Sequence, residues 1–114
     1  MKSILTLVLI LIGTLTHAQT CDELVAYAQS EDAYPDTFTA YGSSLVAKAE
    51  HYSVGNSRLT IVYLKDNDYD YSGDPYIYCG VSDYAWSQFK YATVDGSYGK
   101  SYHAYIRDNT CVCD

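Results

Sequence analysis

Apolar residues alternate with polar ones and then change to helical spacing between Pro75 and Ile106, and this segment organises the predicted fold. Tyr76–Cys79 has the alternation of a strand, and Gly80 supplies a turn directly after it. A helix over 82–92 is then predicted by apolar residues at helical spacing, namely Val81, Ala85, Trp86, Phe89 and Ala92. Because this helix carries the single Trp and one of the two Phe, we expect it to fold back and bury them against the strand.

A second C-terminal helix follows a predicted turn at Val94–Gly99. Tyr98, Tyr102, Tyr105 and Ile106 lie at helical spacing, which predicts a short helix over Lys100–Arg107, packed beside the first. Five residues are expected to form the core of this half of the chain: Val81, Trp86, Phe89, Tyr102 and Ile106.

The pattern over residues 20–64 predicts a helix followed by strands. Thr20 and Glu23 have the spacing of a capping box, which begins a helix, and the polar segment 31–36 ends it. Residues 37–41 predict a short strand, and residues 45–64 predict a hairpin with its turn at Val54–Ser57.

Alternation within the hairpin assigns its faces. The first strand places Leu45, Ala47 and Ala49 on one side, and the other side receives Val46, Lys48, Glu50 and Tyr52. Leu59–Leu64 is apolar on both faces, as in a central strand. The whole pattern predicts an α+β fold, in which an N-terminal helix and two C-terminal helices cover a small antiparallel sheet of three or four strands.

Residues 1–18 have the pattern of a secretory signal peptide, with Lys2 before the apolar run Ile4–Ile12 and small residues up to Ala18. The run is shorter than the roughly 20 residues of a membrane-spanning helix, so we expect no membrane span and a secreted or periplasmic protein. The predicted organisation is a signal peptide (1–18), an N-terminal helix and loop (19–42), a main domain (43–107) and a cysteine-containing tail (108–114).

All four cysteines follow the predicted signal, and an even number in a small exported domain predicts two disulfides. Pairing Cys111 with Cys113 closes a strained ring across one residue. Cys21 and Cys79 are therefore each expected to take one of these two as partner, in either of two arrangements. A metal or redox site needs a spacing such as C-x-x-C, which the tail does not have.

The chain is acidic, with a formal net charge of -7. Removing residues 1–18 removes Lys2 and no acid, which leaves six Lys and Arg against 14 Asp and Glu, a net charge of -8. Such a surface repels phosphate backbones, so a nucleic-acid partner is not expected.

Turn and core residues between Ser43 and Arg107 carry a family resemblance: Ser43, Ser44, Tyr52, Leu59, Val62, Tyr76–Val81, Trp86, Phe89, Ala92, Ser97, Gly99, Lys100, Tyr102, Ile106 and Arg107. This segment resembles the KTSC domain, a short module found at the C-terminus of some lysyl-tRNA synthetases and in many small bacterial and phage proteins. The resemblance implies a small antiparallel sheet covered by helices, and no settled chemistry. The chain departs from the family at Ser82, where Pro is usual, and at Tyr102-His103, where Phe-Asn is frequent. The tRNA association implies RNA contact, which the acidic charge opposes.

The acidic loop 66–74 is the sharpest polar cluster. Its first three carboxylates copy the start of an EF-hand loop, but Tyr71 stands where that loop needs Gly and Ile77 where it needs Glu. We expect a solvated connection between strands, with a weak calcium site as the alternative and no other cofactor. The residues of that alternative site are Asp66, Asp68, Asp70 and Asp74.

The 14 tyrosines are the most unusual feature of the composition. Tyr52, Tyr63, Tyr78, Tyr102 and Tyr105 are expected to be partly buried structure. An exposed binding patch is predicted for a second group, Tyr69, Tyr71, Tyr76, Tyr84 and Tyr91. Tyrosine offers rigid amphipathic contact area, which suits a protein or glycan partner.

No catalytic residue is identified from spacing. Cys79 and His103 form a thiol and base pair only if Cys79 is free, which the disulfide prediction opposes. We therefore predict a secreted binding or interaction module stabilised by disulfides, with a small hydrolase whose site is assembled in space as the alternative. A pocket with converging, perturbed ionisable groups favours the enzyme, whereas an exposed aromatic patch without such a cluster favours the binder.

Overall fold

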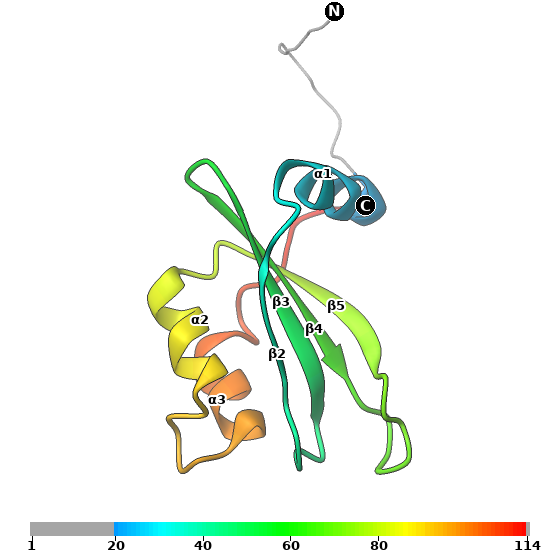
Figure 1. The fold of residues 1–114 in the computed structure, drawn as a ribbon, viewed down its shortest axis with the longest axis vertical. Coiled ribbons are helices and arrows are strands. Elements are labelled where there is room, and N and C mark those ends of the chain that lie inside the picture. Colours follow the sequence, from blue (N-terminus) through cyan, green and yellow to red (C-terminus); the bar gives the residue numbers. More distant parts are fainter. Residues whose placement is uncertain (1–19, 114) are drawn as a thin grey trace, which may run out of the picture.

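A computed structural model describes residues 20–113 and shows a four-stranded antiparallel sheet with three helices (Figure 1). The elements are α1 (Cys21–Glu31), β2 (Asp36–Thr39), β3 (Val46–Val54), β4 (Ser57–Leu64), β5 (Asp74–Cys79), α2 (Asp83–Lys90) and α3 (Tyr98–Tyr105). The strands lie in the order β2-β3-β4-β5, which confirms the α+β prediction. The predicted signal peptide lies outside the described residues. Within 20–113, no helix has both the length and the apolar character to cross a bilayer.

Side chains cap the start of each helix. At α1, the Thr20 hydroxyl accepts the Glu23 N–H (3.1 Å) and the Glu23 carboxylate accepts the Thr20 N–H (2.8 Å), as the capping box predicts. At α2, the Ser82 hydroxyl accepts the Ala85 N–H at 3.1 Å. Ser97 caps α3 in the same way.

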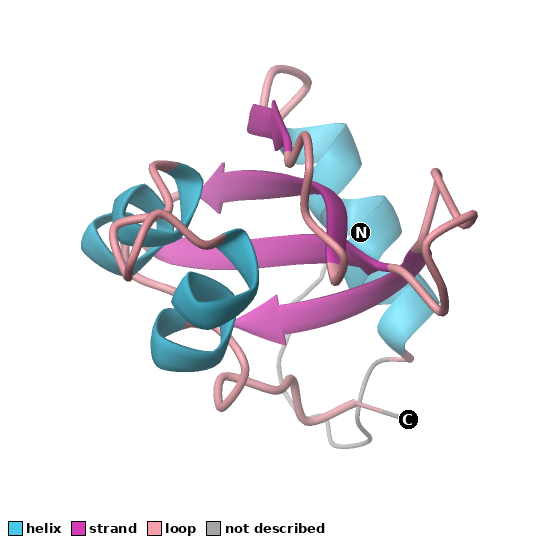
Figure 2. Cartoon of the chain, turned by 90° about the horizontal axis from the view of Figure 1, so that it is seen from below, coloured by secondary structure: helices cyan, strands magenta, loops and turns pink. Residues whose placement is uncertain are grey.

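The sheet is buried on both faces, as the apolar strand β4 requires. Val62 packs in the cluster beneath α2 and α3, whereas its neighbour Ile61 packs in the cluster beneath α1. Seen from below, α2 and α3 lie in front of the strands and α1 lies behind them (Figure 2).

The larger core lies between the sheet, α2 and α3. Its members include the five residues expected there, which are between 0 and 4% exposed: Val81, Trp86, Phe89, Tyr102 and Ile106. The hydroxyls of Tyr78 and Tyr102 hydrogen-bond to each other inside this core. Burial raises the pKa of Tyr78 far above its ordinary value, and the hydrogen bond satisfies the polar tips of both side chains inside the core.

The predicted face of Val46 is wrong. A bulge interrupts the β3–β4 register between Val46 and Lys48, so the strict alternation of β3 begins only after it. Val46 therefore packs in the α2/α3 core with Ala49, while Tyr52 packs on the α1 side.

Two disulfides, Cys21–Cys113 and Cys79–Cys111, confirm the predicted number and select one of the two arrangements. The tail follows the edge of β5, where the Cys79 N–H donates to the Asn109 carbonyl at 2.7 Å. Because Cys79 has no free thiol, the thiol and base pair with His103 is excluded.

Candidate functional site

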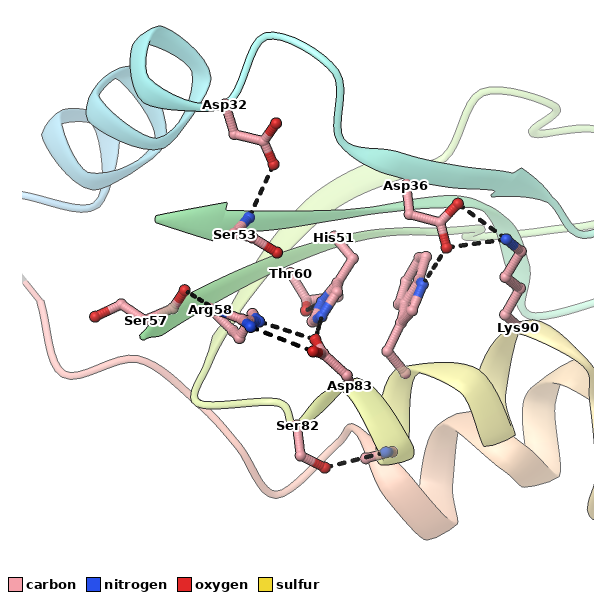
Figure 3. A network of polar contacts seen from close by, with 12 residues as sticks. Asp32, Asp36, His51, Ser53, Ser57, Arg58, Thr60, Ser82, Asp83 and Lys90 are labelled. Atoms are coloured by element: carbon pink, nitrogen blue, oxygen red, sulfur yellow. Dashed lines mark hydrogen bonds and ion pairs between the residues drawn. The ribbon is translucent and has the colours of Figure 1, made fainter. Parts of the chain in front are cut away.

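A hollow of about 550 Å³ opens between the loop before β2, the strands β2 and β3, and the length of α2. Half-buried Asp32, Ser87 and Lys90 line it, and its exposed members are Tyr34, Asp36, Ser53, Asp83 and Tyr91. Its buried members are His51 and Trp86, which form the floor, and we call it the Tyr34–Tyr91 hollow. Figure 3 shows the polar contacts that fix this floor.

His51 is placed by two polar partners from different elements. Its Nδ1 lies 2.8 Å from the hydroxyl of Thr60, the residue directly opposite it on β4. Its Nε2 lies 3.0 Å from Asp83 Oδ1 at the start of α2. An ionised carboxylate only accepts hydrogen bonds, so Nε2 carries the proton and Nδ1 accepts from Thr60. Burial lowers the pKa of His51 although Asp83 opposes this, so the neutral ring is favoured.

Asp83 joins the hairpin to α2. Arg58 donates to both of its oxygens, from Nε at 2.8 Å and from Nη2 at 3.2 Å. The hydrogen bonds from Arg58 and then His51 hold the pKa of this carboxyl far below its ordinary value. The remaining terminal nitrogen of Arg58 donates to the Gly55 carbonyl and to the Ser57 carbonyl (Figure 3) in the β3–β4 turn. One guanidinium therefore links this turn to the start of α2.

Trp86 forms the second half of the floor. Its indole stacks on His51, with centroids 4.9 Å apart and planes 8° from parallel. Its Nε1–H donates to Asp36 Oδ2 at 2.7 Å, and Lys90 Nζ lies 2.9 Å from both oxygens of that carboxylate. Burial opposes ionisation of Asp36, but the bonds from Trp86 and Lys90 outweigh it and lower its pKa. Asp36, at the start of the edge strand β2, thereby joins α2 to the sheet through two side chains.

The row Thr60, His51, Asp83 contains the residue types of a hydrolase triad, but it is not arranged for catalysis. Thr60 is fully buried, so its hydroxyl cannot reach a substrate. Nδ1 is the ring nitrogen of His51 that can accept a proton, and it contacts only this buried hydroxyl, while Nε2 donates to Asp83. The row is a structural support beneath an open surface.

Sequence reasoning missed this network. His51, Asp83 and Asp36 come from three elements that are brought together only by the tertiary fold, and no spacing rule joins them. The one local signal is a histidine in a predicted strand, opposite a strand that carries a threonine. Asp83 lies in the first turn of α2, where an acid favours the helix dipole, and its carboxylate also binds His51 and Arg58.

The acidic loop brings three of its four predicted ligands together. Asp66, Asp70 and Asp74 place one oxygen each within 4.8 Å of one another, whereas Asp68 lies apart, beside Lys65 and Tyr71 in a different hollow. Three carboxylates supply only part of the six to eight oxygens that calcium takes, so the calcium site stays a prediction.

Hydrogen bonds within the acidic loop set the charges of its carboxyls. Asp70 accepts the N–H groups of Asp66 and Gly73, which lower its pKa. A hydrogen bond to the Asp66 carboxyl raises the pKa of Asp74. Gly73 has φ +69°, and a Cβ there would lie 2.9 Å from the Tyr63 carbonyl carbon, so the loop requires glycine at this turn.

The five tyrosines predicted as a binding patch are all exposed, but they are spread over the molecule. Tyr71 shares a hollow with Tyr41, Tyr76 lines another beside α1, and Tyr91 borders the Tyr34–Tyr91 hollow. Tyr84 contacts Tyr105 on α3, and Tyr69 lies in the acidic loop. Tyr34 was not singled out from the sequence, although it is the most exposed tyrosine, at 92%.

Comparisons with protein-family models, curated proteins and solved structures give no match to this chain. The resemblance to the KTSC domain therefore stays a prediction.

Proposed function

We propose that this chain is an exported, disulfide-stabilised binding module that holds its partner at the Tyr34–Tyr91 hollow. The observation that carries this proposal is the pair of exposed tyrosines, 92% and 69% accessible, beside polar groups that are fixed from below. Exposed rings of this size are typical of contact surfaces, because they bury a large rigid area when a partner arrives.

Rigidity of the floor supports a binding role. His51 and Trp86 are held by Thr60, Asp83 and Asp36, so the surface above them needs little reorganisation when a partner binds. Binding then costs less conformational entropy than it would at a flexible loop. The loop carrying Tyr34 is itself tied to β3, since Asp32 accepts the Ser53 N–H at 2.9 Å.

The alternative, a small hydrolase, has one observation in its favour. Ionisable groups with shifted pKa values do converge at this hollow, which is common at active sites. Each of these groups is paired with another within the protein, and the hydroxyl next to the histidine is buried. Pairing within the protein accounts for the lowered pKa values of Asp36 and Asp83, and burial accounts for that of His51, so binding is the better proposal.

Two properties of the whole chain support export and an extracellular partner. All four cysteines form disulfides, which persist in oxidising compartments. The net charge of -7 disfavours nucleic acid.

Affinity capture from the extracellular and periplasmic fractions tests the proposal. Wild-type chain should retain a component that the double variant Tyr34→Ala/Tyr91→Ala does not. The matched control is Tyr41→Ala/Tyr71→Ala, which removes two equally exposed rings, 85% and 80%, from a different hollow. Unfolding midpoints of both variants should stay close to wild type, because exposed side chains contribute little to stability. Equal capture by the wild type and the Tyr34/Tyr91 variant would overturn the proposal.

A further inference from the structure

We infer that the ligand of the Tyr34–Tyr91 hollow is a neutral glycan, one sugar unit of which lies against the exposed tyrosines. This inference rests on the proposed function and gives its partner a chemical class. The argument uses the charge balance of the hollow, its free hydrogen-bonding positions and its exposed rings.

The charges in the hollow are almost completely paired. Asp36 is neutralised by Lys90, and Asp83 is neutralised by Arg58. Among the described residues, Asp32 is the one carboxylate of the hollow without a cationic partner. One half-buried carboxylate at an open hollow attracts a cation weakly, since solvent limits an ion pair near the surface to about 1 kcal/mol or less. The hollow therefore does not select strongly for a charged ligand of either sign.

The free polar positions mainly accept hydrogen bonds. Asp32 accepts the Tyr34 N–H through Oδ1 (3.2 Å) and the Ser53 N–H through Oδ2 (2.9 Å). A carboxylate has about four acceptor positions, so both oxygens retain one position for a ligand while the backbone fixes their orientation. The Ser53 and Ser87 hydroxyls add groups that donate and accept. A polyhydroxylated ligand supplies the O–H donors that this fixed carboxylate can take.

The exposed rings supply the apolar half of sugar recognition. A pyranose presents hydroxyls at its rim and C–H groups on its faces, so it needs polar acceptors beside a flat apolar surface. Tyr34 and Tyr91 offer such surfaces with only two side-chain torsions each to immobilise, and Asp32 lies two residues from Tyr34 in the same loop. The volume of about 550 Å³ lies within the range of small-ligand sites.

Calorimetric titration of the oxidised chain tests this inference. The probes are neutral hexasaccharides of glucose, N-acetylglucosamine, xylose and mannose, together with a lysine- and arginine-rich peptide. At least one hexasaccharide should bind, with an affinity unchanged between about 50 and about 500 mM salt, because no ion pair forms. That affinity should fall at least about tenfold, or 1.4 kcal/mol, in Tyr34→Ala/Tyr91→Ala. It should also fall in Asp32→Ala and stay unchanged in the Tyr41→Ala/Tyr71→Ala control.

The other outcomes separate the two proposals. Binding to none of the hexasaccharides, or sugar binding that the Tyr34/Tyr91 variant retains, overturns the glycan inference. Salt-sensitive binding of the peptide alone, lost in the same variant, also overturns it but leaves the binding-module proposal standing. If neither probe binds and capture is equal for wild type and variant, both proposals fall.

Discussion

The Thr60 hydroxyl lies 2.8 Å from His51 Nδ1, at a directly paired position of β4 and β3. Both side chains are buried. The other ring nitrogen donates to the Asp83 carboxylate, so the Thr60 hydroxyl must donate to Nδ1. A neutral histidine is thus held in a single tautomer between the sheet and α2, and its ring supports Trp86.

Replacing Thr60 with Val should destabilise the protein although the two side chains have the same shape. Valine has no hydroxyl, so His51 Nδ1 is left buried without a donor. An unsatisfied buried polar group costs about 1–3 kcal/mol, and urea unfolding at pH 7 measures this loss. Thr60→Ser keeps the hydroxyl and should lose less stability than the valine variant. A valine variant as stable as wild type would show that the hydroxyl is unimportant.

Acid should weaken the fold through His51. Burial, with the charge of Arg58 nearby, lowers the pKa of His51 against the opposing effects of Asp83 and Asp36. A lowered histidine pKa means that the unfolded chain binds the proton more readily, so stability falls as the pH drops below about 6.5, the unfolded pKa. The slope is at most about 1.4 kcal/mol per pH unit for one proton and ends below the folded pKa.

Unfolding free energies between pH 8 and pH 5 test this dependence, with His51→Gln as the matched variant. Glutamine does not titrate, so the variant should be less stable than wild type at pH 7 but nearly independent of pH across this window. A wild-type profile as flat as that of the variant contradicts the prediction. Below about pH 4, Asp83 and Asp36 add a further loss in the wild type, because both have lowered pKa values.

Local signals in the sequence predicted the elements well. The capping box at Thr20 marks the start of α1, because a cap depends only on its own turn, and the helix predicted over 82–92 begins within one residue of the observed α2. The apolar character of Leu59–Leu64 on both faces identified β4 as central, since only a strand covered on both sides buries such a run.

The site could not be predicted in the same way. Asp83 reaches His51 across 32 residues, and Asp36 reaches Trp86 across 50, so neither contact has a sequence period. The bulge that turns Val46 to the opposite face has no marker in its alternating neighbours. The choice between the two disulfide arrangements depends on where the tail meets β5, which is a tertiary property.

The variant Trp86→Phe isolates the indole hydrogen bond. Phenylalanine keeps an aromatic ring in the core but cannot donate to Asp36, so the free energy of unfolding should fall by about 1–3 kcal/mol. The pKa of Asp36 should rise at the same time, because a donor to its ionised form is lost. Carbon-detected NMR titration of the aspartates measures this rise. Lys90→Met is the control: it should also raise the pKa of Asp36, at a smaller cost in stability because Lys90 lies near the surface. An unchanged pKa in Trp86→Phe contradicts the assigned contact.

Removing either disulfide should cost about 4–5 kcal/mol on the chain-entropy estimate, since the bridges join residues 32 and 92 positions apart. Their local effects should differ. Cys79→Ala/Cys111→Ala should release the tail from β5, so the amide of residue 79, which donates to Asn109, should exchange faster with solvent. In Cys21→Ala/Cys113→Ala the same amide should stay protected relative to global unfolding. Equal protection in both variants would show that the Cys79–Cys111 bridge does not hold the tail in place.

The acidic loop gives the last prediction. The pKa of Asp74 is raised by its hydrogen bond and charge repulsion with Asp66, so its ionised form opposes folding above that pKa. Asp74→Asn should therefore raise the unfolding midpoint at pH 7 more than at pH 3, because acid protonates Asp74 and removes its repulsion with Asp66. If calcium binds the loop, adding about 1–10 mM calcium should raise the unfolding midpoint of the wild type, because this concentration reaches and exceeds the dissociation constants of weak extracellular sites. The midpoint of Asp68→Asn should rise in the same way, and that of Asp74→Asn should not. Asp68 serves as the control because it lies outside the cluster. A wild-type midpoint that calcium leaves unchanged, together with no heat of binding, contradicts the calcium prediction and leaves the repulsion between Asp66 and Asp74 as the property of this loop.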